Sequence, residues 1–153
     1  MDVPSFLKDE ADDIVIAGMG GELIADILSA CEWTNKAKKC FILQPMSRAP
    51  LLRRWLYANG YVIKEEVACT SAERPYTVMQ VYYTGEKTEL GEYDLFTYIG
   101  GLGKSGGVAS REYIRRAAVA LVKRENGVLG SDPAQAMRLR SLSNKMLSMI
   151  EGW

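Results

Sequence analysis

Two short apolar runs predict strands in the first part of the chain, at residues 14–17 and at 39–43, where the apolar residues follow Lys39. The first run has no polar alternation, which is typical of a strand that is buried on both faces. A segment with apolar residues at helical spacing follows each run, at 22–31 and at 50–60. Pro50 suits the first turn of the second helix, where a backbone N–H group is not needed. The pattern therefore predicts strand, helix, strand and helix in this order.

The pattern changes after Gly60, where β-branched and aromatic residues become frequent. They predict two further strands, at 61–68 and 76–83, joined by a short polar loop at 70–74. Two consecutive strands with such a short connection pair antiparallel. We therefore expect an α/β sheet that ends in an antiparallel hairpin.

Helical spacing returns in the last third of the chain. Residues 110–124 form one helical pattern, which we expect Asn126 and Gly127 to end. The run 131–133, Ser-Asp-Pro, predicts the start of a second helix, because Asp caps a helix well and Pro fits its first position. Two helices with a short connection pack as an antiparallel hairpin. This change of pattern divides the chain into two predicted domains, 1–90 and 91–153.

The segment 93–105 looks like a strand that leads into a phosphate-binding loop, because it ends in Gly103-Lys104-Ser105. The spacing GxxxxGK[ST] requires a glycine where Tyr98 stands, and a side chain there obstructs the turn around the phosphates. We therefore interpret the segment as a flexible, glycine-rich link. A phosphate-binding module that uses residues 100–105 is kept as a minor hypothesis.

Composition limits the class of protein. Apolar residues make up 48% of the chain and charged residues 25%, which is typical of a globular protein. No apolar run approaches the ~20 residues of a membrane helix, and the first ten residues do not have the pattern of a signal peptide. The cysteines, Cys31, Cys40 and Cys69, are odd in number and widely spaced, which indicates a reducing compartment. We expect a cytoplasmic protein without a metal site and without membrane association.

The chain has no histidine, which excludes Ser-His-Asp and Cys-His nucleophile systems. Its charge is unevenly distributed: residues 1–103 contain 10 Lys and Arg against 15 Asp and Glu, whereas residues 104–153 contain 9 against 4. A basic C-terminal third predicts an anionic macromolecular partner. Solvated helix faces explain the same charges equally well.

The first predicted strand runs into a glycine-rich turn at residues 18–21, and a helix follows. A strand, a glycine turn and a helix N-terminus form the usual ligand-facing corner of a doubly wound sheet. Glycines allow the backbone to approach a ligand closely, and the helix start offers unpaired N–H groups. A tight turn without a ligand explains this local pattern equally well.

Several stretches together resemble one family, the bacterial tRNA (adenine-N1) methyltransferases that modify the adenine at position twenty-two. The stretches are 14–21, 23–28, 41–45, 52–56 and Gly60-Tyr61. The resemblance covers about residues 11–83, and the predicted helical hairpin suits the family's C-terminal coiled-coil-like domain. The implied fold is the C-terminal half of a class I methyltransferase sheet of the Rossmann-like type, with an antiparallel terminal hairpin, followed by an α-helical hairpin.

The first half of that family has no counterpart in this sequence. It carries the glycine-rich cofactor loop and the acid that holds the ribose of S-adenosylmethionine. Residues 14–17 would then be the fourth of seven strands, and the strands present would lie in the spatial order four, five, seven, six. The fourth strand would be an exposed edge, which predicts self-association through that edge or pairing with another chain. We expect an incomplete enzyme that binds its cofactor poorly alone.

The resemblance implies S-adenosylmethionine as cofactor and adenine N1 as the methyl acceptor. N1 has a free lone pair that attacks the methyl group directly, so the protein has to orient the reactants rather than remove a proton. Gln44 would either read an edge of the adenine or cap a turn. The implied catalytic residues are Gly18, Met19, Gly20, Gly21, Gln44 and Pro45, and the implied cofactor contacts are Ala17, Gly18 and Met19.

The implied partner is tRNA. An aromatic side chain at the start of the last strand would stack on a base, and arginines would contact phosphates. The predicted RNA contacts are Tyr76, Arg48, Arg53, Arg54, Arg115 and Arg116. For each of them, strand packing or a solvated surface charge is the alternative. A non-catalytic RNA-binding or assembly module of the same ancestry is the second hypothesis for the whole chain.

Overall fold

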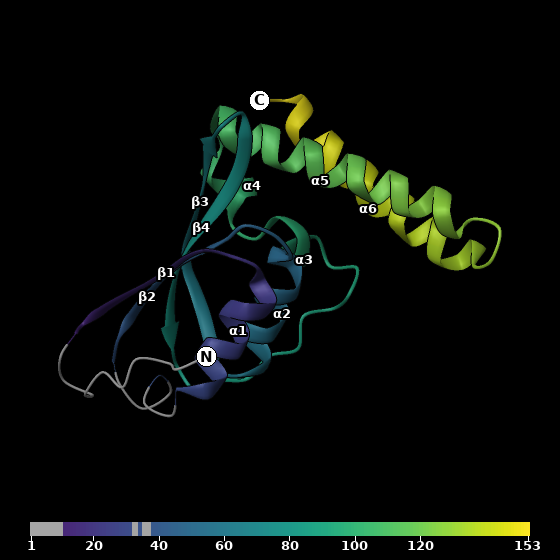
Figure 1. Cartoon of the computed structure of the whole chain (residues 1–153). Coiled ribbons are helices and arrows are strands. Elements are labelled where there is room, and N and C mark those ends of the chain that lie inside the picture. The colour runs from purple at the N-terminus through teal and green to yellow at the C-terminus, as the bar shows by residue number, and fades with distance from the viewer. Residues whose placement is uncertain (1–10, 32–33, 35–37) are drawn as a thin grey trace.

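The computed structural model describes residues 11–31, 34 and 38–153 (Figure 1). The first ten residues, on which the argument against a signal peptide depends, lie outside this part. The elements are β1 (Asp13–Met19), α1 (Gly21–Ala30), β2 (Cys40–Pro45), α2 (Ala49–Ala58), β3 (Tyr61–Ser71), β4 (Arg74–Tyr83), α3 (Leu95–Ile99), α4 (Leu102–Ser105), α5 (Gly107–Val128) and α6 (Pro133–Glu151).

The described strands form one mixed sheet in the order β1-β2-β4-β3. β1 pairs parallel with β2, so that Ile14 lies opposite Phe41 and Ile16 opposite Leu43. β4 pairs antiparallel with both β2 and β3. The structure thus confirms the predicted α/β fold with its antiparallel terminal hairpin, and the strand order agrees with the spatial order four, five, seven, six.

Helices α1 and α2 pack against one face of the sheet. The core between these layers contains Ile16, Ile24, Leu28, Phe41, Leu43, Leu52, Leu56, Met79 and Val81. The prediction that residues 14–17 are buried on both faces is wrong. Ile16 points into this core, but Val15 alternates to the opposite face and is 68% exposed. β1 lies at the edge of the sheet, and only one face of this apolar strand packs against the core.

The hairpin between β3 and β4 is tighter than the predicted loop at 70–74. The ladder continues to the pair Ser71 and Arg74, which leaves a turn of Ala72 and Glu73. Both turn residues have positive φ, 47° and 61°. Turns of this hand match the twist of the flanking strands, which allows pairing up to the tip.

The segment predicted as a flexible link forms two short helices, α3 and α4, with Gly100 and Gly101 between them. Gly100 has a φ of 53°, and a Cβ atom there would overlap the Glu66 carboxylate. Glycine is therefore needed for close packing at this position rather than for flexibility.

Helices α5 and α6 form the predicted helical hairpin, which extends as an arm beyond the sheet (Figure 1). They share a second core with α3 and α4, made of Ile99, Leu102, Ile114, Ala118, Leu121, Leu139, Leu142, Met146 and Ile150. As predicted, α6 begins at Pro133, and Asp132 Oδ1 accepts a hydrogen bond from Gln135 N at 2.9 Å. No helix in the described part of the chain combines the length and the apolar composition needed to cross a membrane.

The prediction that Asn126 and Gly127 end the first of these helices is wrong, because α5 continues to Val128. The Glu125 carboxylate is buried and pairs with Arg140 of α6 at 2.5 Å. Val128 packs against the second core. These tertiary contacts outweigh the low helix propensity of an Asn-Gly pair.

Candidate methyl-transfer site and its neighbouring cleft

The loops that follow β1 and β2 are joined by backbone hydrogen bonds. The two strands are parallel, so their carboxyl ends meet at one edge of the sheet. Met46 N donates to the carbonyl of Met19, and Gly21 N donates to the carbonyl of Ser47, both at 2.8 Å. The glycine turn and the end of β2 therefore form one rigid unit, at the position where ligands bind in open α/β sheets.

Gly18 and Gln44 are bonded to each other within this unit. Gly18 N donates to Gln44 Oε1 at 2.9 Å, and the φ of Gly18 is 76°, which favours glycine. The other end of the amide, Nε2, contacts the Met46 sulfur at 3.3 Å, a weak acceptor. The side-chain oxygen of Gln44 thus fixes the turn, and its NH₂ group keeps a donor for a ligand.

The predicted turn residues differ in their exposure. Ala17 and Gly18 are exposed, and Met19 and Gly20 are half-buried. Gly21 is buried, and a Cβ atom there would lie 2.6 Å from the Arg48 carbonyl oxygen. Gly21 therefore allows the start of α1 to pack against the start of α2. The exposed part of the turn, Ala17 and Gly18, can contact a ligand.

A cleft of about 630 Å³ opens beside this unit, between the β2–α2 connection, the tip of the β3–β4 hairpin, Tyr98 and α5. We call it the arginine–tyrosine cleft, after the side chains Arg48, Arg74, Arg116, Arg124, Tyr76, Tyr98 and Tyr113 that line it. Pro45, which is buried, and Met46 belong to its wall as well. No acidic side chain lines the cleft within the described residues.

Three of these arginines are paired with carboxylates that are not part of the cleft lining. Arg48 contacts the exposed Glu22 at 3.0 Å. Arg116 contacts Glu112 at 2.7 Å, and Arg124 contacts Glu92 at 3.3 Å. Exposed pairs of this kind contribute at most about 1 kcal/mol, so a polyanion can displace the carboxylates.

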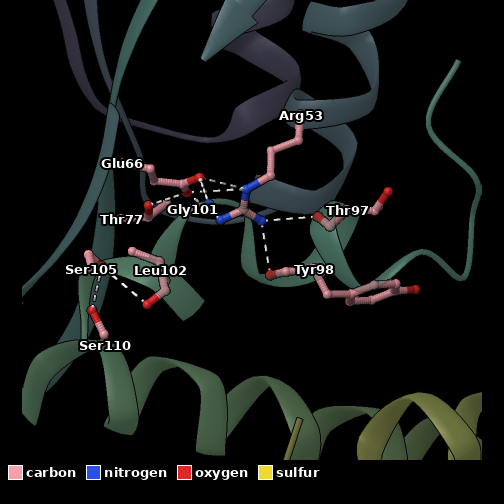
Figure 2. A network of polar contacts seen from close by, with 9 residues as sticks. All are labelled: Arg53, Glu66, Thr77, Thr97, Tyr98, Gly101, Leu102, Ser105 and Ser110. Carbon is pink, nitrogen blue, oxygen red and sulfur yellow. Dashed lines mark hydrogen bonds and ion pairs between the residues drawn. The ribbon is translucent and has the colours of Figure 1, made fainter. Parts of the chain in front are cut away.

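Arg53 does not have the predicted role of a phosphate contact, because its side chain is fully buried. Its Nη2 atom pairs with Glu66 Oε1 at 2.5 Å, and its Nη1 atom donates to the carbonyls of Thr97 and Tyr98 at 3.0 and 2.9 Å (Figure 2). Burial disfavours the charge and the Tyr113 and Glu66 side chains favour it, with the net effect that the pKa of Arg53 is raised. The guanidinium is thus a permanent charge inside the protein, out of reach of RNA.

The same network orients one wall of the arginine–tyrosine cleft. Glu66 also accepts hydrogen bonds from Thr77 Oγ1 at 2.5 Å and from Gly101 N at 3.0 Å. In Figure 2 the Tyr98 carbonyl faces Arg53, whereas the Tyr98 ring points away from the guanidinium. The buried ion pair therefore holds α3 and α4 against α2 and β3 and fixes the position of Tyr98.

The other predicted RNA contacts lie in different places. Arg48, Tyr76 and Arg116 line the arginine–tyrosine cleft together. Arg54 is exposed in a neighbouring cleft of about 530 Å³, and Arg115 lines neither cleft and pairs with Glu112 at 2.8 Å. The sequence did not point to Arg74, Tyr98 and Tyr113, because only the tertiary structure brings β4, α3 and α5 together.

Among the described residues, no group of three or more His, Cys, Asp or Glu side chains could hold a metal ion. The polar groups at the sheet edge instead suit one side of S-adenosylmethionine, because the exposed backbone of residues 17–19 and the Gln44 amide offer neutral hydrogen-bonding groups. The acid at the start of α1, Glu22, is paired with Arg48. The described residues therefore fit one wall of a site for this cofactor.

Comparisons with known proteins agree with this geometry. The family described as "Methyltransferase domain" matches residues 3–79. The tRNA (adenine(22)-N(1))-methyltransferase of Bacillus subtilis (strain 168) is 44% identical over 72 residues, which cover 47% of this chain and 30% of that protein. The matched stretch thus spans less than a third of this curated relative.

Two solved structures share the fold. The crystal structure of the B. subtilis M1A22 tRNA methyltransferase TrmK superposes with a TM-score of 0.67 at 25% identity, covering 96% of this chain and 64% of that one. Streptococcus pneumoniae Sp1610 in complex with S-adenosyl-L-methionine gives 0.67 at 24% identity, covering 96% and 62%. The chain belongs to the methyltransferase-domain family, and it is similar to the tRNA m1A22 methyltransferases named above.

Proposed function

We propose that this chain takes part in the transfer of a methyl group from S-adenosylmethionine to N1 of an adenine in tRNA. One observation carries the proposal: the bonded turn of Gly18 and Gln44 adjoins a cleft lined by arginines and tyrosines and by no described acid. Such a cleft suits a ligand that is both anionic and aromatic, as a nucleotide is. The named activity of the relatives agrees with it. A tRNA substrate implies a cytoplasmic location.

The chain's part in the reaction is to bind and orient. S-adenosylmethionine, when bound, supplies an electrophilic methyl group on a positively charged sulfur. The exposed backbone of Ala17 and Gly18, with Met19 beside them, forms the wall that this chain offers to it. Because the turn is held by Gln44 and by the Met46 N–H group, it is preorganised and does not have to be ordered on binding.

To accept the methyl group, the adenine needs a hydrogen-bond donor that orients it and does not need a general base. Adenine N1 uses its lone pair on the methyl group, so the Gln44 NH₂ group is free to donate to another ring nitrogen, such as N7. Met19 can pack on the face of the base. A paired adenine must first leave its helix, which costs a few kcal/mol and favours a weakly paired target.

The decisive experiment incubates the chain with S-adenosylmethionine and unmodified tRNA and detects N1-methyladenosine by mass spectrometry. Because the described residues form only one wall of the cofactor site, we expect the product in low yield, a further loss of methyl transfer of about tenfold or more with Gln44→Ala as for a lost orienting contact, and no change with Gln135→Ala on α6. A chain that neither methylates nor binds tRNA would overturn the proposal.

A non-catalytic RNA-binding or assembly module is the second candidate. The observation in its favour is that the arginine–tyrosine cleft lies entirely within this chain, whereas the described residues form one wall of a cofactor site. Binding of tRNA without binding of S-adenosylmethionine in calorimetry would support this candidate. The division at residue 90 and the self-association through the β1 edge stay predictions.

A further inference from the structure

We propose that the arginine–tyrosine cleft binds a single-stranded segment of RNA that flanks the target nucleotide. Phosphates would lie on Arg74, Arg116 and Arg124, and bases on the cleft tyrosines. This inference rests on the proposed function in taking RNA as the ligand. It goes further in assigning the strand to a defined cleft between the sheet and the helical hairpin.

The charge of the cleft selects an anion. Its described lining contains four arginines and no aspartate or glutamate. The carboxylates that pair with three of the arginines are not part of the lining and are themselves at least partly exposed. For Arg74, no ion pair is found among the described residues. A phosphodiester can therefore bind without burying an opposing charge, and counterion release favours its binding.

The aromatic side chains of the cleft favour single-stranded RNA over a duplex. Tyr76, Tyr98 and Tyr113 are all half-buried and come from three different elements. The Arg53 guanidinium lies 6.0 Å from the centre of the Tyr113 ring and steadies it from the protein interior. Exposed bases of a single strand stack on such rings, whereas the bases of a duplex are stacked on each other.

The cleft is held open by contacts that exist without a ligand. Arg116 Nη2 donates to the carbonyl of Glu73 at 2.8 Å and so ties α5 to the tip of the β3–β4 hairpin. On the other side the Tyr98 hydroxyl accepts from Arg124 Nη1 at 3.3 Å. With the Tyr98 carbonyl anchored on Arg53, two walls are fixed relative to each other, which lowers the entropy cost of binding.

The cleft also lies in the right place relative to the turn. Met46 belongs to its wall, and the Met46 N–H group is bonded to the Met19 carbonyl. A strand seated in the cleft therefore ends next to the turn of Gly18 and Gln44. The consequence for the substrate is that nucleotides next to the target adenine have to be unpaired or opened.

The test measures binding of a short fluorescent single-stranded oligoribonucleotide by anisotropy, without cofactor. The cleft variant is Arg74→Ala with Arg124→Ala. The matched control is Lys123→Ala with Lys145→Ala, which removes the same charge from the hairpin outside the cleft lining. We expect about tenfold weaker binding for the cleft variant, a salt slope lower by about 1.4, and a change below about twofold for the control.

A second variant separates stacking from charge. Tyr76→Leu keeps an apolar side chain but removes the ring. We expect this variant to bind single-stranded RNA several-fold more weakly and to bind duplex RNA with unchanged affinity. Thermal unfolding of each variant shows whether it is folded.

Equal losses in the cleft and control variants, or tighter binding of a duplex or an acidic peptide, would overturn the inference. Because anisotropy measures RNA binding and needs no methyl transfer, a chain that fails to methylate tRNA can still support this inference. Conversely, unchanged RNA binding in the cleft variants would overturn the inference without touching the proposed chemistry.

Discussion

Arg53 and Glu66 form an ion pair whose side chains are both 0% exposed, with Nη2 and Oε1 2.5 Å apart. The pair joins α2 to β3, and its remaining hydrogen-bonding groups reach Thr77, Thr97 and Gly101. No buried side-chain nitrogen or oxygen of the described residues lacks a partner. A buried charge pair that is satisfied in this way costs much to break, although it contributes less than its Coulomb energy suggests.

Arg53→Ala is expected to lower the free energy of unfolding by about 3–5 kcal/mol, because it leaves the Glu66 carboxylate buried without its counter-charge. Urea denaturation measures the loss. Arg54→Ala, the adjacent exposed arginine, serves as the control and should change stability by no more than about 0.5 kcal/mol. Replacing both partners by Met should restore much of the loss. A cost below about 1 kcal/mol for Arg53→Ala would contradict the assignment.

Gly21→Ala is expected to cost about 1–3 kcal/mol, because the new methyl group would lie 2.6 Å from the Arg48 carbonyl oxygen and 3.1 Å from Leu52 Cβ. Hydrogen exchange should show faster opening of the amides of Gly21 and Met46, which join the two loops. Gly130→Ala, where no atom lies within 4 Å of the added carbon, is the control. Equal stability of the two variants would show that the loops are not closely packed.

Glu112→Gln is expected to increase RNA affinity by about two- to five-fold, because the Glu112 carboxylate competes with phosphates for Arg115 and Arg116. Anisotropy titration at low salt measures the effect, which should fall as salt is raised. Glu151→Gln on α6 removes the same charge at a carboxylate that is in none of the ion pairs found among the described residues, and it should have a smaller effect. A decrease in affinity with Glu112→Gln would show that the carboxylate orders the cleft instead of competing with RNA.

The pKa of Glu112 should be about 2, lowered from its usual value of 4.5 chiefly by the hydrogen bonds from Arg115 and Arg116. Because the folded value is the lower one, the contribution of Glu112 to stability is present above pH 4.5 and is lost as the pH falls towards 2. Carboxyl chemical shifts in an acid titration measure the value. In the double variant Arg115→Ala with Arg116→Ala the pKa should return towards normal, and an unchanged value would refute this cause.

Asp132→Ala is expected to destabilise the protein by about 1 kcal/mol, because it removes the acceptor for Gln135 N at the start of α6. Thermal unfolding provides the measurement. Asp132→Asn retains a capping oxygen and should stay close to the original stability. If both substitutions cost the same, the charge of Asp132 rather than its cap would be responsible.

Local sequence determined the identity and order of most elements. Apolar runs, Pro50 and the Asp132-Pro133 start predict the strands and helices, because these signals act within a few residues of the chain. Resemblance to a family then supplied the strand order, which no local signal contains. The carboxyl ends of β1 and β2 meet at one edge of the sheet because the two strands pair in parallel.

Tertiary structure decided what depends on residues far apart in the chain. Arg53 has the same sequence signal as its neighbour Arg54, but only Arg53 faces Glu66 and is therefore buried. The helix passes through Asn126 because Glu125 pairs with Arg140 of the next helix. The cleft brings residues of β2, α2, β4, α3 and α5 together, so its arginines and tyrosines could not be grouped from the sequence. Local signals set the type and order of most elements, whereas burial, charge pairing and the end of α5 depend on long-range contacts that only the folded chain makes.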